Sequence, residues 1–291
     1  MRLIELIDTQ AARLDQAGVC FGHGTTNAFD EAAWLVLWKL GHPLDALDEV
    51  AEHALAPDQV LAVEALVAER IASRRPAAYL TGEAWLQGVP FFVDERVIVP
   101  RSLIAEPLAD GTLDVWLSDQ TRHVLDLCTG NGSLAVLAAL AWPEVVVDAA
   151  DLSADALAVA SKNVARHGLG DRITLHQGDG LAAVPGRVYD LILCNPPYVN
   201  RASMAALPPE FRAEPALALD GNADGGSDGM DFVRTLLRGV ASQLSPQGVL
   251  VLEIGHERAY FEAAFPQLHP VWLSTSAGDD QVLLLTRDSF A

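Results

Sequence analysis

An asparagine, two prolines and an aromatic residue follow one apolar run of the chain, and residues of these types in this order can hold a planar group. The run 189–194 has the sequence of a short buried strand, and Asn195, Pro196, Pro197 and Tyr198 come directly after it. Proline cannot donate to a sheet ladder and pushes the residue before it toward an extended conformation, so the strand ends there in a stiff loop. Such a loop offers the Asn195 oxygen and backbone carbonyls to a planar N–H group. The alternative is a strand-ending turn capped by asparagine.

A glycine-rich turn follows a second apolar run, predicted as a strand at 123–127. The turn and the end of this strand share residue types that suit a close ligand: Asp126, Cys128, Thr129, Gly130 and Gly132. The two glycines let the backbone bend tightly and approach a ligand. No Lys-Ser or Lys-Thr follows, which excludes a loop that cradles a nucleoside triphosphate.

Acidic residues end the next two predicted strands. Asp151 lies nineteen residues after Gly132 and is followed by Leu152. This is the position of a carboxylate that accepts both ribose hydroxyls of a nucleoside, through bonds worth roughly 1.5–3 kcal/mol each. Asp148 competes for this role but lies in mid-strand, so we prefer Asp151. Asp179 ends the third strand and could accept from an adenine amine, or it could be an aspartate in a turn.

The elements that must position these residues alternate between strand and helix from residue 104 onward. Helices are predicted at 104–117, 133–141, 153–167, 229–244 and 256–264, and strands at 123–127, 145–150, 173–177, 189–194, 249–254, 271–274 and 281–286. Alternation predicts an α/β fold with a doubly wound, Rossmann-like sheet, and the short turn between the final two strands makes its last edge antiparallel. The segment 199–228 is predicted as a long loop, and 221–229 as its most flexible part.

The N-terminal quarter has a different pattern. Helices predicted at 3–17, 29–40, 44–55 and 58–73 make residues 1–75 a small helical bundle. Two β-like runs lie near 84–86 and 90–93, and 91–99 resembles a hairpin whose polar turn is 94–96. We therefore divide the chain into a helical domain at 1–75, a β-hairpin linker at 76–103 and a catalytic domain at 104–291. Arg101, in the linker, could reach a cleft.

Aspartates at strand ends of a Rossmann-like sheet fit either a dinucleotide or S-adenosylmethionine. Three features favour S-adenosylmethionine: the third glycine of the dinucleotide fingerprint is absent, an antiparallel seventh strand closes the sheet, and the fourth strand ends in Asn-Pro-Pro-Tyr.

The composition limits the partners. The 291 residues carry a formal charge of −20, which opposes nucleic-acid binding and suits a basic protein partner, although acidity can also serve solubility alone. No apolar run reaches the roughly 18 residues of a membrane span, and the N-terminus does not have the pattern of a signal peptide. Cys20, Cys128 and Cys194 are an odd number without paired spacing, which favours a reducing cytoplasm and argues against a zinc site. We expect no metal.

The motifs together are similar to one enzyme family. The order Asp-x-x-Thr-Gly-x-Gly, Asp151 and Asn-Pro-Pro-Tyr resembles the class I methyltransferases that act on planar nitrogens, which include adenine-amine and HemK-like glutamine amide methyltransferases. The segments 79–82 and 99–102 resemble the HemK-like family. The segments 22–32, 100–106 and 207–215 resemble its PrmB branch, which acts on a ribosomal protein. Two departures stand out, because Cys128 replaces the first glycine of the cofactor loop and the loop at 221–229 is longer than usual.

The resemblance implies roles for individual residues. The Asn195 oxygen and the Pro196 carbonyl would accept the two N–H bonds of a glutamine amide, and Tyr198 would pack on the amide plane. Pro197 and Arg101 would join the substrate site. S-adenosylmethionine would be bound by the glycine loop, namely Asp126, Cys128, Thr129, Gly130 and Gly132, together with Asp151, Leu152, Asp179 and Asn195. No general base is evident.

Three functions follow, in order of preference. The first is methylation of a glutamine in large-subunit ribosomal protein three, a basic protein that is either free or part of an assembling particle. The second is the same reaction on a peptide-chain release factor, against which the Pro-Arg-Ser segment speaks. The third is adenine methylation of nucleic acid, which the charge opposes. We expect neither membrane contact nor sequence-specific nucleic-acid binding. A non-catalytic adapter is disfavoured by the intact motifs.

Overall fold

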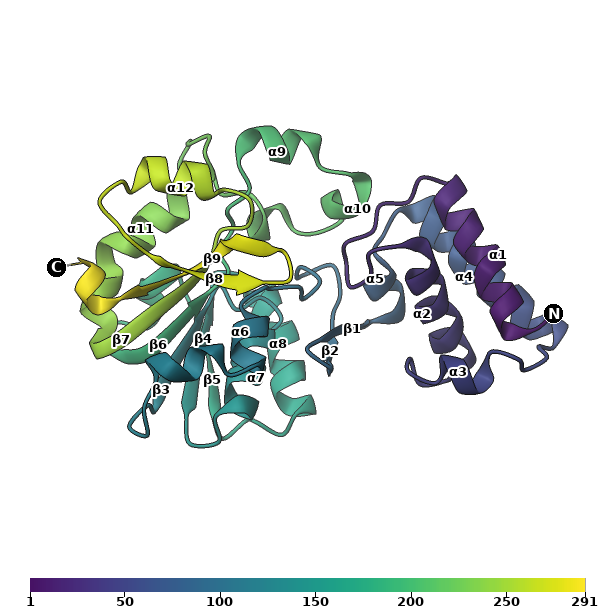
Figure 1. The fold of residues 1–291 in the computed structure, drawn as a ribbon, viewed down its shortest axis with the longest axis horizontal. Helices are drawn as coiled ribbons and strands as arrows, with labels where there is room; N and C mark the ends of the chain where they lie inside the picture. The colour runs from purple at the N-terminus through teal and green to yellow at the C-terminus, as the bar shows by residue number, and fades with distance from the viewer. Residues whose placement is uncertain (291) are drawn as a thin grey trace.

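The computed structural model describes residues 1–290 and has a helical part and a sheet-containing part (Figure 1). The N-terminal helices are α1 (Leu3–Gln16), α2 (Ala28–Leu40), α3 (Leu47–Val50), α4 (Pro57–Ser73) and α5 (Ala77–Thr81). Their buried face continues into Val93, Val97 and Val99 and reaches Ala156 and Val159 on the sheet side. The helical part therefore packs against the rest of the chain through a shared apolar core.

The helix predicted at 44–55 is wrong in extent, because only Leu47–Val50 is helical. The residues after it form a turn and then an isolated antiparallel bridge between Ala54 and Arg2, at the start of α1. The N–H of Leu3 donates to the His53 carbonyl and that of Ile4 to the Ala51 carbonyl, both at 3.0 Å. These two bonds satisfy N–H groups that the first turn of a helix leaves free, so tertiary contact outweighs local helix propensity here.

The β-like runs predicted near 84–86 and 90–93 are confirmed, but the hairpin predicted over 91–99 is wrong, because these two strands pair with each other. Strand β1 (Glu83–Leu86) pairs antiparallel with β2 (Val89–Phe92). The two residues between them, Gln87 and Gly88, have φ angles of 49° and 74°, as a tight two-residue hairpin turn demands. Residues 94–96 instead form a local turn in which the Asp94 carboxylate pairs with Arg96.

The seven-stranded sheet is confirmed. Its strands are β3 (His123–Leu127), β4 (Val146–Asp151), β5 (Ile173–Gln177), β6 (Tyr189–Cys194), β7 (Leu244–Glu253), β8 (Val271–Thr275) and β9 (Gly278–Thr286), in the order β5-β4-β3-β6-β7-β9-β8. Strand β9 runs antiparallel to both of its neighbours, and the other pairs are parallel. The strand order reverses between β3 and β6. Ligands of open α/β sheets bind at such a point, beyond the carboxyl ends of the strands.

Helices cover both faces of the sheet. One apolar layer includes α6 (Ala105–Ala109), α7 (Ser133–Ala141) and α8 (Ala154–Arg166), and the other includes α11 (Asp231–Gly239) and α12 (Arg258–Ala264). The helix predicted at 104–117 is interrupted, because Gly111 has a φ of 81° and a 3₁₀ turn, η1 (Thr112–Trp116), follows it. The helix predicted at 229–244 ends at Gly239 and continues as η4 (Val240–Gln243). Two further 3₁₀ turns are η2 (Gly180–Ala183) and η5 (Arg287–Phe290).

The segment predicted as the long loop 199–228 contains secondary structure. It forms α9 (Arg201–Ala206), α10 (Pro209–Arg212) and η3 (Ala216–Ala218), and α10 lies toward the N-terminal helices (Figure 1). Among residues 1–290, no helix is both long and apolar enough to cross a bilayer.

Three fully buried ionic groups join α10 to the N-terminal helices. The Arg70 guanidinium donates to the Glu31 carboxylate at 2.9 Å and lies 3.6 Å from that of Glu210. Arg74 approaches the same Glu210 oxygen at 2.8 Å, and the Cys20 N–H donates to it. Burial raises the pKa of Glu31, and Arg70 opposes this effect. Each charge in this cluster depends on its partners, because an unpaired buried charge is costly.

We predict that Arg70→Met lowers the free energy of unfolding by about 3–5 kcal/mol, because the buried Glu31 loses its hydrogen-bonded cation and the buried Glu210 keeps only Arg74. The matched control is Arg75→Met, whose partner Glu95 is half exposed, so the loss should stay below about 1 kcal/mol. Urea denaturation followed by circular dichroism measures both. Equal losses in the two variants would contradict the prediction.

Candidate active site

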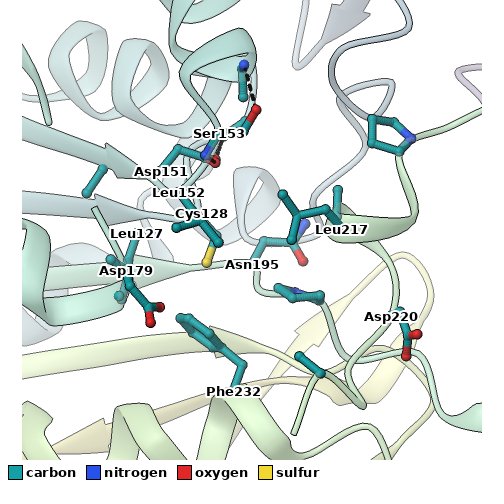
Figure 2. A pocket seen from close by; sticks show the side chains of 18 of the residues that line it. Leu127, Cys128, Asp151, Leu152, Ser153, Asp179, Asn195, Leu217, Asp220 and Phe232 are labelled. Atoms are coloured by element: carbon teal, nitrogen blue, oxygen red, sulfur yellow. Dashed lines mark hydrogen bonds between the residues drawn. The ribbon is translucent and has the colours of Figure 1, made fainter. Parts of the chain in front are cut away.

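A cavity of about 270 Å³ opens beyond the carboxyl ends of β3, β4, β5 and β6 (Figure 2). The predicted site residues that line it come from four separate strand ends: Cys128, Gly130, Asp151, Leu152, Asp179, Asn195 and Pro197. Leu127 and Phe232 add apolar surface, and the linker contributes Arg96, Val97 and Ile98. The cavity therefore combines apolar walls with carboxylates at its rim. We call it the donor cavity.

Asp151 is bound to the glycine loop. Its carboxylate accepts the Gly130 N–H at 2.9 Å and the Ser153 N–H at 2.8 Å. Burial raises the pKa of Asp151, and these backbone bonds oppose that shift. Each carboxylate oxygen keeps a second lone pair for a ligand hydroxyl. The competing acid, Asp148, lies away from this cavity and is paired with Arg187 and His176.

Three of the predicted cofactor residues shape the loop without lining the cavity. Asp126 is 1 % exposed, and one of its oxygens accepts both the Thr129 hydroxyl at 2.5 Å and the Ala135 N–H at 2.9 Å. Gly132 has a φ of 81°, and a methyl group added there would lie 3.2 Å from the Ala160 side chain. Asp126, Thr129 and Gly132 therefore stabilise the turn between β3 and α7.

Cys128 stands where the resemblance leads us to expect glycine. It has a φ of 61°, a conformation that costs an L-residue roughly 1–2 kcal/mol. A hydrogen bond with the Cys194 thiol, together with burial, raises the pKa of the Cys128 thiol well above its ordinary value. The thiol is therefore neutral and adds polarisable surface to the donor cavity.

A second cavity of about 170 Å³ lies on the other side of Asn195, and we call it the acceptor cavity. Its lining combines two further residues of the Asn-Pro-Pro-Tyr motif with the linker, the 199–228 segment and the end of β7: Ile98, Arg101, Pro196, Tyr198, Leu207, Phe211 and Glu253 among them. Pro197, predicted for the substrate site, lines the donor cavity instead. Asn195 lines both cavities, as do Ile98 and Ala218. Within residues 1–290, no hydrogen bond occupies the Asn195 side chain, so it is available to a ligand.

The sequence analysis missed Glu253, which holds Tyr198 in place. The Tyr198 hydroxyl donates to one Glu253 oxygen at 3.1 Å, while the other accepts the Ser102 hydroxyl at 2.6 Å and the Leu103 N–H at 2.9 Å. Burial raises the pKa of Tyr198 well above 10, so its hydroxyl is a neutral donor. The only sequence signal was an acid at the end of the buried strand β7.

Arg101 lines the acceptor cavity, but its charge is already paired. Its two terminal nitrogens donate to the two oxygens of the buried Glu214 at 2.6 and 2.7 Å. Burial alone would raise the pKa of Glu214, but Arg101 and the nearby His23 outweigh burial and lower it to about 2. Arg101 therefore anchors the 207–215 segment. The sequence analysis singled out the segment 207–215 but assigned no role to Glu214 within it.

The segment predicted as most flexible is held by hydrogen bonds. The Asn222 side chain accepts the Gly229 N–H at 2.9 Å and donates to the Val199 carbonyl at 3.0 Å. The Asp231 carboxylate accepts the N–H groups of Asp224 and Gly226. A methyl group on Gly229 would come within 2.0 Å of the Tyr198 carbonyl oxygen. The absence of a side chain at Gly229 therefore allows the segment to pack closely on the Asn-Pro-Pro-Tyr loop.

The fold and the paired cavities define a Rossmann-like methyltransferase of class I. Residues 111–219 match the family model described as "Methyltransferase small domain". A solved structure titled as a methyltransferase from Pyrococcus furiosus is 17 % identical, covers 77 % of this chain and 97 % of its own, and has a TM-score of 0.50, which supports the fold alone.

Curated relatives identify the family. A protein of Bordetella pertussis named ribosomal protein uL3 glutamine methyltransferase is 56 % identical over 98 % of this chain and 95 % of its own length. One of the same name from Burkholderia pseudomallei is 52 % identical over 97 % and 93 %. The chain belongs to this family of ribosomal protein uL3 glutamine methyltransferases.

We predict that Asp126→Asn changes the pH dependence of stability. Burial raises the pKa of Asp126 to about 7, whereas an unfolded aspartate titrates near 4. Between these values the folded protein holds the proton more tightly, so this residue lowers stability as the pH rises. The variant cannot ionise, and its amide oxygen can still accept both bonds. The free energy of unfolding of the variant, relative to that of the wild type, should therefore rise by about 2–4 kcal/mol as the pH increases from 4 to 7.

Urea unfolding of both proteins at pH 5, 6 and 7 measures this difference. If the difference in unfolding free energy between the variant and the wild type is the same at all three pH values, the titration does not belong to Asp126.

Proposed function

We propose that this chain transfers a methyl group from S-adenosylmethionine to the side-chain amide nitrogen of a glutamine in ribosomal protein uL3. The products are methylglutamine and S-adenosylhomocysteine. The observation that carries the proposal is that Asn195 lines both cavities, so one side chain can contact a bound donor and a bound acceptor. The names of the curated relatives supply the substrate.

The donor cavity has the chemistry that S-adenosylmethionine needs, and this cosubstrate supplies a methyl group on a sulfonium sulfur. Asp151 keeps lone pairs for the ribose hydroxyls, and Asp179 carries a carboxylate at the rim for the adenine amine. Leu127, Leu152 and Phe232 offer apolar surface to the base. The Gly130 backbone lies beside Asp151, where a side chain would crowd the ligand. Asp126, Thr129 and Gly132 act by holding the loop.

The residues Asn195, Pro196 and Tyr198 can position an amide nitrogen, which is a poor nucleophile. The lone pair of an amide nitrogen is delocalised, so the enzyme must hold the NH₂ group with its nitrogen facing the methyl carbon. The Asn195 side-chain oxygen and the Pro196 carbonyl accept the two N–H bonds, and Tyr198 packs on the amide plane. Pro197 stiffens the loop. Catalysis is then mostly positioning in a water-poor site.

The transfer forms the nitrogen–carbon bond as the carbon–sulfur bond breaks, and the nitrogen afterwards releases a proton to solvent. Glu253 is a poor proton acceptor for this step, because both of its oxygens already accept hydrogen bonds. It is a positioning residue for Tyr198. The acceptor pair also gives selectivity, because an alcohol would leave one buried acceptor unpaired and a carboxylate would leave both unpaired.

The other candidates have less support. A release-factor glutamine would undergo the same chemistry, but the relatives that match over nearly the full chain are named for uL3. Adenine methylation of nucleic acid requires a basic surface, and this chain has a charge of −20.

We also propose that residues 1–75 recognise the protein substrate, that 76–103 link them to the catalytic part, and that catalysis lies in residues 104 onward. The basic character of uL3 as partner and a cytoplasmic location remain predictions. Whether free uL3 or an assembling particle is the substrate would be decided by comparing methylation of the two.

Two substitutions should distinguish the role of the donor cavity from that of the acceptor cavity. Asn195→Ala removes an acceptor for the amide, so we predict at least a hundredfold loss of kcat. Because Asn195 also lines the donor cavity, the affinity for S-adenosylmethionine should fall too, but by less than in Asp151→Ala. Asp151→Ala removes the ribose acceptor, so that affinity should fall at least tenfold. Radiolabel transfer to unmethylated uL3 and calorimetry with S-adenosylmethionine measure the two effects. No labelling of uL3 by the wild type, or equal labelling by Asn195→Ala, would refute the proposal.

A third substitution tests the packing of Tyr198. Gly255 follows β7 with a φ of 51°, and a methyl group there would lie 2.6 Å from the Tyr198 ring. Gly255→Ala should displace the ring and lower kcat for uL3 about tenfold or more, because the acceptor plane is lost. Gly18→Ala is the matched control, since Gly18 has a φ of 59° and no atom within 4 Å of an added methyl group. Similar kcat values for the two variants would argue against a role for the ring.

A further inference from the structure

A groove on the N-terminal helical part lies outside both cavities of the active site. It has a volume of about 710 Å³ and is bounded by α2, the 43–47 segment, the loop at 24–25 and the β1–β2 hairpin. Its walls are mainly apolar and aromatic, and they include Phe29, Trp34, Leu44 and Trp85. We call it the N-terminal groove.

Two aromatic side chains of this groove face solvent. Phe29 is 39 % exposed and Trp85 is 43 % exposed. They come from separate elements, α2 and β1, and meet at one concave site. Exposed aromatic residues that gather in a groove mark a binding surface more often than scattered ones do.

The charges of the N-terminal groove have one sign. Asp30 and Asp45 line it, and none of its lining residues is a lysine or an arginine. Neither aspartate forms an ion pair with any of the described residues. With a charge of −20 on the whole chain, this combination attracts a cationic ligand and repels anionic ones.

The N-terminal groove is joined to the acceptor cavity by a short stretch of chain. Gly24 and Thr25 line the groove, and the adjoining His23 packs on Phe211 with the ring centroids 4.2 Å apart. Phe211 in turn lines the acceptor cavity. A protein bound in the groove could therefore extend to the site that holds its glutamine.

We propose that the N-terminal groove binds a basic segment of the protein substrate, with one large apolar side chain against Phe29 and Trp85 and lysine or arginine side chains at Asp30 and Asp45. This proposal rests on the proposed function, because it takes the substrate to be a protein that binds ribosomal RNA and is therefore rich in basic residues. A second copy of this chain, an anionic membrane and a nucleic acid carry the wrong charge for this surface.

The test uses the full chain, unmethylated uL3 and a charge-matched pair of double variants. The groove variant is Asp30→Asn with Asp45→Lys. The control is Glu144→Gln with Asp171→Lys, which changes the charge equally at two exposed residues that line neither the groove nor the two active-site cavities. A third protein, Trp85→Ala, removes an exposed aromatic wall without altering any charge. Circular dichroism verifies that each variant is folded.

We expect the groove variant to raise both the Kd and the KM for uL3 at least fivefold, with kcat and the affinity for S-adenosylmethionine within twofold of wild type. Trp85→Ala should raise the KM at least threefold, and the control should match the wild type. The Kd of the wild type should also rise with salt more steeply than that of the groove variant.

Two outcomes would overturn the groove proposal: a Kd for uL3 that is the same in the groove variant and the control, or no binding of uL3 by the wild type. The binding measurement needs no turnover, so it is independent of the reaction. If the wild type binds uL3 through the groove but transfers no methyl group, the proposed function is wrong and the groove proposal stands.

Discussion

Parallel pairing between β3 and β6 is the constraint on which the rest of the site depends. Leu127 is opposite Cys194 in this pair, so the residues that follow, Cys128 and Asn195, leave the sheet side by side. The strand order reverses at the same place, which leaves a crevice. The two prolines after Asn195 then end β6 at this edge. A one-residue shift in this register would move Asn195 away from the glycine loop.

Buried carboxylates tie the acceptor side of the site to the N-terminal helices. Glu210 contacts Arg70 and Arg74, while Glu214 holds Arg101 and lies beside His23. Both acids belong to the 207–215 segment, whose Leu207 and Phe211 line the acceptor cavity. One wall of that cavity therefore depends on contacts with residues of the first quarter of the chain. The helical part is in this sense a structural component of the site, in addition to any contact with substrate.

The donor cavity and the surfaces for the protein substrate are formed by different parts of the chain. One side of the donor cavity is formed by strand ends, where backbone positions are fixed by sheet pairing and by the buried Asp126, and the linker and residues 215–224 complete it. The acceptor cavity and the N-terminal groove lie between elements from distant parts of the chain, where surface is available for a large partner. Glu253 connects the two regions, because it ends β7 and binds both Tyr198 and the linker.

The sequence by itself determined the alternating strands and helices, the glycine loop, Asp151 and the Asn-Pro-Pro-Tyr stop, because hydrophobic period, glycine and proline act over a few neighbouring residues. It predicted the runs at 84–86 and 90–93 but placed the hairpin turn at 94–96, because the polar residues there also suit a turn. It did not determine the short helix at 47–50 or the order within 199–228, because long-range hydrogen bonds and buried ion pairs outweigh local preference there. Nor could it pick out Glu253 and Glu214 among the acidic residues of the chain. Their importance arises from burial beside Tyr198 and Arg101, more than 50 residues away in each case, and only the tertiary structure decides which carboxylates are buried together with a partner.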